Sequence, residues 1–183
     1  MKILVHTRDI SMRTFDLGNR SILVEGRLLD HRYQPRGAKA SEPEPVHHMA
    51  IQLKVKGPRM VIEQAGAKMP HHPRKECSEV LPWIRNLKGL EIAPGYTLKV
   101  KKVIGGVRGC AHLTSLVIAM GESAVQGYWA AYGPKKGRLH ELTIRKFINT
   151  CHLWTEDGPI LKEIRENLDS ETHRNVKSKV SEK

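Results

Sequence analysis

The 183-residue chain has little cysteine, few aromatic residues and no long apolar run. Its three cysteines are an odd number and nothing suggests export, so a disulfide framework is not expected. Aromatic residues make up 5% of the chain and the three tryptophans are dispersed, which argues against a platform for stacking nucleic-acid bases. Charge interrupts the first residues before a signal-peptide core can form, and no run approaches the roughly 20 apolar residues that cross a bilayer. We therefore expect a cytoplasmic protein with reduced thiols and no membrane association.

Nucleotide-binding fingerprints are also missing. The glycines at positions 105, 106 and 109 follow a predicted helix, whereas a P-loop or a dinucleotide-binding loop follows a strand. The net charge of +12 would attract polyanions, but the basic residues are spread along the chain rather than gathered in one stripe. An acidic protein partner therefore stays open, and nucleic acid is a less favoured partner that the charge alone does not exclude.

Alternating apolar residues and turn residues predict two β-hairpins. The predicted strands cover residues 3–15, 20–31, 47–55 and 60–67. In the third strand His47 falls on the apolar face, together with Met49 and Ile51. The proline-rich segment from Tyr33 to Pro45 indicates a surface loop, which is long enough to cover a site.

Helices are predicted after the second hairpin, with the longest one starting near Leu113. The predicted helices cover residues 78–88, 94–104, 113–128 and 139–150. Runs of strands followed by runs of helices indicate an α+β fold, here an antiparallel meander of about four strands packed against several helices. We expect one domain over residues 1–158 and a charged helix or tail over 159–183, partly disordered.

Cys110 lies in the most informative stretch, the glycine-rich segment that leads into the longest predicted helix. A helix N-terminus carries unpaired N–H groups and a partial positive charge, and Arg108 adds a full one. Both favour the thiolate, which is a nucleophile as well as a metal ligand.

A metal site needs three or four thiolate or imidazole ligands that converge in space. The sequence offers His47, Cys77, Cys110 and His112 for such a site, with zinc or an iron–sulfur cluster as the cofactor. Cys110 and His112 are two residues apart, so they can share an ion only if Cys110 lies at or before the start of its helix. The structural alternatives are a hydrogen-bonded histidine facing the core at His47 and a small buried hydrophobe at Cys77.

Several separated motifs resemble a bacterial family known only as a domain of unknown function. They are Glu25–Leu28 with Asp30, Pro45–Met49, Gly105–Leu113 and Cys151 with His152. The third of these carries the family's most specific pattern, Gly-x-x-Gly-Cys-(Thr or Ala)-His-Leu. The resemblance covers residues 6–158 and implies no established activity.

The order of elements around the cysteines is also similar to iron–sulfur scaffold proteins of the NifU amino-terminal type. That resemblance places His47 where the scaffolds have an aspartate, Cys77 at their middle cysteine and Cys110 at their last one. It implies a zinc or iron–sulfur site formed where the helices begin. Gly109 stands where the scaffolds have a histidine.

A second hypothesis is a cysteine-dependent enzyme that acts on a small anionic substrate. Cys110 would be the nucleophile, His112 or His47 the base, and the amides of residues 109–111 an oxyanion hole. Asp30 or Glu25 would orient the imidazole. Cys151 and His152 lie near another predicted helix end, where packing against the core is the favoured interpretation.

Overall fold

The computed structural model describes residues 2–33, 43–133 and 147–166. The chain divides into two compact units, Met1–Gly133 and Pro134–Lys183. The domain boundary expected after Gly158 lies within the second unit and stays a prediction. Within the described part, no helix combines the length and the apolar character that crossing a membrane requires.

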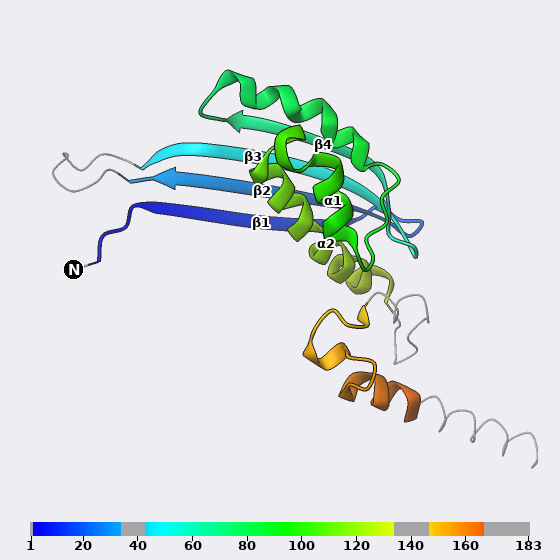
Figure 1. Ribbon diagram of the computed structural model, residues 1–183. Coiled ribbons are helices and arrows are strands. Elements are labelled where there is room, and N and C mark those ends of the chain that lie inside the picture. Colours follow the sequence, from blue (N-terminus) through cyan, green and yellow to red (C-terminus); the bar gives the residue numbers. More distant parts are fainter. Residues whose placement is uncertain (1, 34–42, 134–146, 167–183) are drawn as a thin grey trace, which may run out of the picture. The chain divides into compact units, whose positions relative to one another are not determined.

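Four antiparallel strands form the sheet of the first unit, in the order β1-β2-β3-β4 (Figure 1). They are β1 (His6–Asp16), β2 (Ser21–Arg32), β3 (Glu44–Lys56) and β4 (Val61–His71). The predicted meander and the α+β fold class are therefore confirmed. The first hairpin turns through Gly18 and Asn19, whose φ angles of 76° and 48° lie in the left-handed region that these two residue types tolerate.

The two central strands bury one face of the sheet. Along β2 the buried positions alternate with less buried ones, and β3 repeats this pattern from Met49 to Val55. The buried apolar side chains of these strands are Ile22, Val24, Leu28, Met49, Ile51, Leu53 and Val55. Asp30 and His47 belong to the same face, because side chains two residues apart in a strand point the same way.

Helices cover that face and leave the opposite one open (Figure 1). They are the 3-10 helices η1 (Lys75–Leu87) and η2 (Gly106–Arg108) and the α-helices α1 (Tyr96–Ile104) and α2 (Ala111–Tyr132). The predicted helix 78–88 begins earlier and is a 3-10 helix with Pro82 inside it. Proline lacks an N–H and its ring meets the carbonyl four residues earlier, so a regular α-helix is disfavoured there.

The described part of the second unit is small. It contains the 3-10 helix η3 (His152–Trp154) and a helical stretch over residues 159–166. Phe147 stacks on Trp154 with ring centroids 4.9 Å apart, while Cys151 is exposed. Most of the predicted helix 139–150 and of the predicted loop 33–45 lies outside the described residues.

Candidate metal centre

Three polar side chains form a row across the helix-covered face at one end of the sheet. Arg8 of β1 lies opposite Asp30 of β2, and Asp30 lies opposite His47 of β3. A register irregularity follows immediately, between Asp30 and His31. The row continues the buried face of β2, so Asp30 is a charged residue at a core position.

The N-terminus of α2 brings a second histidine to this row. Cys110 is the N-cap residue of α2, with an extended backbone (φ −121°, ψ 129°), and His112 lies in the first turn. Gly109 precedes Cys110, and a Cβ atom on Gly109 would lie 1.8 Å from the carbonyl oxygen of Ile104. No side chain fits at position 109 without a backbone shift, so the close return of the chain after α1 requires glycine there.

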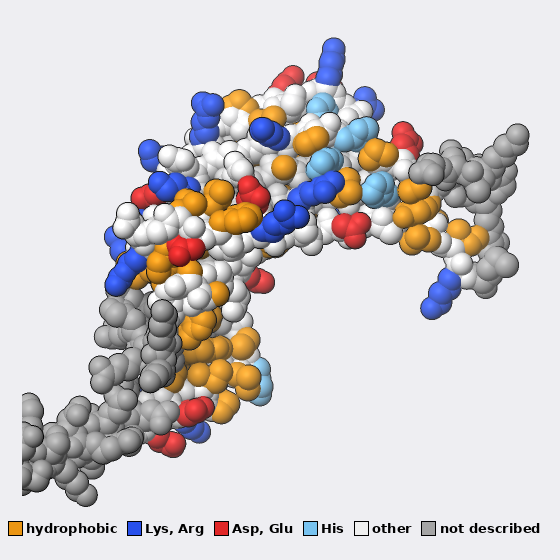
Figure 2. Space-filling model, turned by 180° about the vertical axis from the view of Figure 1, so that it is seen from behind, with side chains coloured by type: hydrophobic (Ala, Val, Ile, Leu, Met, Phe, Trp, Pro, Cys, Tyr) orange, Lys and Arg blue, Asp and Glu red, His pale blue; other side chains and the backbone are white. Residues whose placement is uncertain are grey.

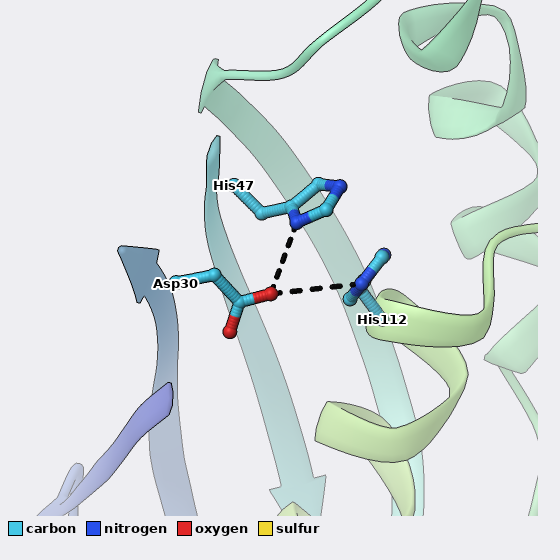
Figure 3. Close-up of side chains that lie close together, drawn as sticks. All are labelled: Asp30, His47 and His112. Atoms are coloured by element: carbon cyan, nitrogen blue, oxygen red, sulfur yellow. Dashed lines mark hydrogen bonds and ion pairs between the residues drawn. The ribbon is translucent and has the colours of Figure 1, made fainter. Parts of the chain in front are cut away.

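Both imidazoles converge on one carboxylate oxygen (Figure 3). Oδ2 of Asp30 lies 2.9 Å from Nδ1 of His47 and 3.7 Å from Nε2 of His112. The two rings are 3.9 Å apart between centroids and are inclined by 31°. One ligand atom from each of the three residues lies within 4.8 Å of the other two.

Arg8 anchors the carboxylate. Its Nε donates to Oδ1 of Asp30 and its Nη2 donates to Oδ2, each at 2.7 Å. Asp30 itself is 1% exposed. The hydrogen bonds from Arg8 outweigh the desolvation of the carboxyl group and, with His47, lower its pKa from 3.8 to about 2. Asp30 is therefore a carboxylate at any physiological pH, with a fixed orientation.

His112 is shifted toward its neutral form. Burial lowers its pKa below the ordinary 6.5, and the neighbouring His47 and Arg8 lower it further, while Asp30 opposes them. A neutral imidazole keeps a lone pair on one ring nitrogen. At neutral pH His112 can therefore act as a metal ligand or as a base.

Cys110 contacts the other side of the His112 ring. Its Sγ lies 3.7 Å from Nδ1 of His112. The backbone around it is held by Thr114, whose hydroxyl donates to the carbonyl oxygens of Cys110 and Ile104. The amide of Gly109, expected to help form an oxyanion hole, donates to the carbonyl of Gly106 instead. The free N–H groups of the first turn of α2 begin after Cys110.

The family model described as a protein of unknown function (DUF2889) matches residues 6–126. The chain belongs to this family. No curated protein and no solved structure matches the chain significantly. The DUF2889 region contains Arg8, Asp30, His47, Cys110 and His112, so the whole cluster lies inside the family domain.

Within the DUF2889 domain, the structure brings some of the expected ligands together. His47 and His112 lie in one cluster, and Cys110 is adjacent to it. Cys77 lies in η1, half-buried against the apolar core, and is not a member of the described cluster. Asp30 takes its place, a residue that the sequence suggested only as an orienting group. The signal for it was present, since Asp30 falls on the buried side of the β2 alternation.

Proposed function

We propose that the chain binds a divalent transition metal ion of the zinc type through Asp30, His47 and His112. The observation that carries this proposal is the convergence of two imidazole nitrogens on one carboxylate oxygen, at 2.9 Å and 3.7 Å. Ligands of a tetrahedral zinc ion, with bonds of about 2.0–2.1 Å, lie about 3.4 Å from one another. The longer separation exceeds a normal hydrogen bond but suits two atoms that share an ion.

The donor set favours a single ion over an iron–sulfur cluster. Clusters are held mainly by cysteine thiolates, and among the described residues only Cys110 places a sulfur beside this cluster. Two histidines and one carboxylate leave coordination positions open, as in catalytic zinc sites and in non-haem iron(II) sites. The iron–sulfur part of the hypothesis and the similarity to NifU-type scaffolds find no support here.

Arg8 is compatible with an ion at this place. The carboxylate oxygen Oδ2 of Asp30 has two lone pairs, and Arg8 takes one of them. The other points toward His47, as the 2.9 Å contact indicates. Arg8 would then be a positioning residue that keeps Asp30 ionised and oriented, in the way outer-shell partners orient metal ligands. Its positive charge weakens the attraction for a cation, so we expect moderate affinity.

The decisive experiment is zinc binding by the purified full-length chain, measured by calorimetry and by metal analysis after dialysis. We expect one ion per chain, and His47→Ala and His112→Ala should each weaken binding by ~100-fold or more, because each removes a direct ligand. The matched control is His48→Ala, which changes the next residue of the same strand on the opposite face. Zinc binding that is absent from the wild type, or equally weakened in the control, would overturn the proposal.

A second candidate function is thiol chemistry at Cys110, which the 3.7 Å contact with His112 favours. Cys110, His112 and Asp30 lie in the order nucleophile, base and orienting carboxylate. A small anionic substrate would be the reactant. Fast alkylation of Cys110 at neutral pH, slowed by His112→Ala and unaffected by a chelator, would favour this enzyme. Alkylation that zinc blocks and a chelator restores would favour metal binding beside the thiol.

A further inference from the structure

Strand β1 forms an open edge of the sheet and is only partly covered by a helix. Among the described residues, its one neighbour in the sheet is β2. Near its C-terminal end, α2 packs against it so closely that a Cβ on Gly127 would meet the side chain of Thr14 at 2.3 Å. In the N-terminal half of the strand, next to its middle residue, Ile10 on the same face is 44% exposed. In the part of the chain that the structure describes, no strand pairs with the outer edge of these eleven residues, and such an edge is a template for pairing with another strand.

We propose that two copies of the chain pair through β1, antiparallel, about a two-fold axis at Ser11. Ser11 is the middle residue of β1, which runs from His6 to Asp16. Pairing centred there lets all eleven residues overlap, and any other centre leaves part of each strand unpaired. The two four-stranded sheets would then join into one continuous sheet.

The register makes the open face of β1 complementary to itself. With Ser11 on the axis, Asp9 of each copy lies opposite Arg13 of the other, so the pair occurs twice. Within the described part of the chain, neither side chain forms an ion pair. Arg13 also lies opposite Glu25 of its own sheet, which places this cation between two acidic residues in the pair. Opposite charges directly across two strands stabilise their pairing.

The helix-covered face is complementary as well. The same register sets Ile10 opposite Met12 of the second copy. Met12 is half-buried and packs against the core, whereas Ile10 is exposed. The two-fold axis therefore brings the covered half of one β1 beside the uncovered half of the other, where the exposed Ile10 gains an apolar neighbour.

Shifted registers lose this match. A shift of the centre by one residue keeps the faces aligned but pairs Asp9 with Ser11 in one direction, and with Phe15 in the other. Arg13 then faces Thr7 or Ser11. Neither alternative sets opposite charges across the strands on the open face, so the register centred at Ser11 is specified by charge as well as by length.

Charge exchange in the full-length chain tests the pairing, with the mass measured by light scattering across a dilution series. We expect a dimer that Asp9→Arg or Arg13→Asp weakens by about tenfold or more, since each substitution creates two like-charged pairs. The double exchange Asp9→Arg with Arg13→Asp should bind more tightly than either single variant, because it forms the two cross-strand pairs again, but more weakly than the wild type, because position 13 then carries an aspartate opposite Glu25. Two results would overturn the proposal. One is a wild type that is monomeric at every concentration of a 100-fold dilution series that starts at the highest soluble concentration. The other is a double variant that dimerises as weakly as the single variants.

Cross-linking tests the position of the axis separately. In a Cys151→Ser background, which removes the exposed native thiol, Ser11→Cys should form a disulfide-linked dimer under mild oxidation. Only a residue on the axis lies opposite itself. Thr7→Cys is the matched control, because it lies on the same strand and face but opposite Phe15. Equal cross-linking of both variants, or none in Ser11→Cys, would contradict an axis at Ser11.

Discussion

The two faces of the sheet surround neighbouring histidines with different contacts. On the helix-covered face, His47 contacts a buried carboxylate, and a second imidazole lies against it. On the open face, the next residue, His48, accepts a hydrogen bond at Nε2 from the Nε of Arg27, at 2.9 Å. Figure 2 shows arginine, lysine and histidine side chains gathered on this face.

The difference shows that the neighbours of a histidine, rather than its presence in the sequence, decide its chemistry. Burial, Arg27 and His71 all lower the pKa of His48. The ring is neutral at neutral pH, but Arg27 occupies the lone pair that a metal would need. His47 instead has a carboxylate beside it, which attracts a cation.

The open face also contains a shallow hollow of about 520 Å³. Small residues such as Ala50 and Gly66 line part of it, together with the basic Arg13, Arg27 and Lys68 and the acidic Glu25. Aromatic side chains are missing from this lining, so it offers no platform for stacking nucleic-acid bases. An acidic protein partner stays a prediction.

The largest contrast between the faces is expected from two adjacent leucines. Leu28 is fully buried beneath the helices, whereas Leu29 points to the open face and is half-buried. We expect Leu28→Ala to lower the free energy of unfolding by about 3 kcal/mol, because it removes buried methyl groups and leaves a cavity. Leu29→Ala should cost about 1 kcal/mol or less. Urea denaturation monitored by circular dichroism measures both, and equal losses would contradict this assignment of the faces.

Two glycines give the next contrast. Gly109→Ala places a Cβ 1.8 Å from the Ile104 carbonyl oxygen, whereas a Cβ on Gly66 of the open face meets nothing within 4 Å. We expect Gly109→Ala to cost about 2 kcal/mol in stability and to weaken metal binding, since it displaces Cys110 and His112. Gly66→Ala should change the stability by less than ~0.5 kcal/mol. Thermal unfolding and zinc titration of both variants check this, and a Gly109→Ala variant as stable as the wild type would refute it.

Local patterns were sufficient to predict most of the fold. The alternation from His47 to Val55 predicted both the third strand and the face on which His47 lies, and turn residues predicted both hairpins. The start of η1 was missed because its first residues carry neither an apolar period nor a capping side chain. Alternation and turn residues are properties of short segments, so they can be recognised in the sequence without the tertiary structure.

The site was only half predictable because it depends on register. Asp30 meets His47 through the pairing of β2 with β3, and the segment that joins these strands has no pattern from which the pairing can be counted. Cys77 was expected from the order of elements, but order does not determine which side of a helix faces a site. Gly109 was noted as a departure from the scaffold pattern, and its physical reason is the Ile104 carbonyl, a contact across a turn.

The last comparison is between two acidic residues of β2 on opposite faces. The pKa of Asp30 is about 2 in the folded chain, against the ordinary value of 3.8 that applies to the unfolded chain. At a pH between these two pKa values, the Asp30 carboxyl group is protonated in the unfolded chain but ionised in the folded chain. The free energy of unfolding therefore falls as the pH falls from about 4 to about 2. The shift corresponds to about 2 kcal/mol. We expect Asp30→Asn to be less stable than the wild type at neutral pH. Its free energy of unfolding should also depend less steeply on pH on the acid side of the curve, the acid limb.

Glu25→Gln is the matched control, because Glu25 lies on the open face, where Gln52 donates to it at an exposed position. This substitution should change the loss of stability in acid less than Asp30→Asn does, because water screens an exposed hydrogen bond. Urea denaturation at pH steps from 6 to 2.5 measures all three proteins. Part of the limb should persist in Asp30→Asn, since hydrogen bonds from Tyr132 and Gly18 lower the pKa of Asp16 as well. An Asp30→Asn curve parallel to the wild type would mean that Arg8 does not hold the carboxylate in the folded chain, and the metal centre would lose its anchored ligand.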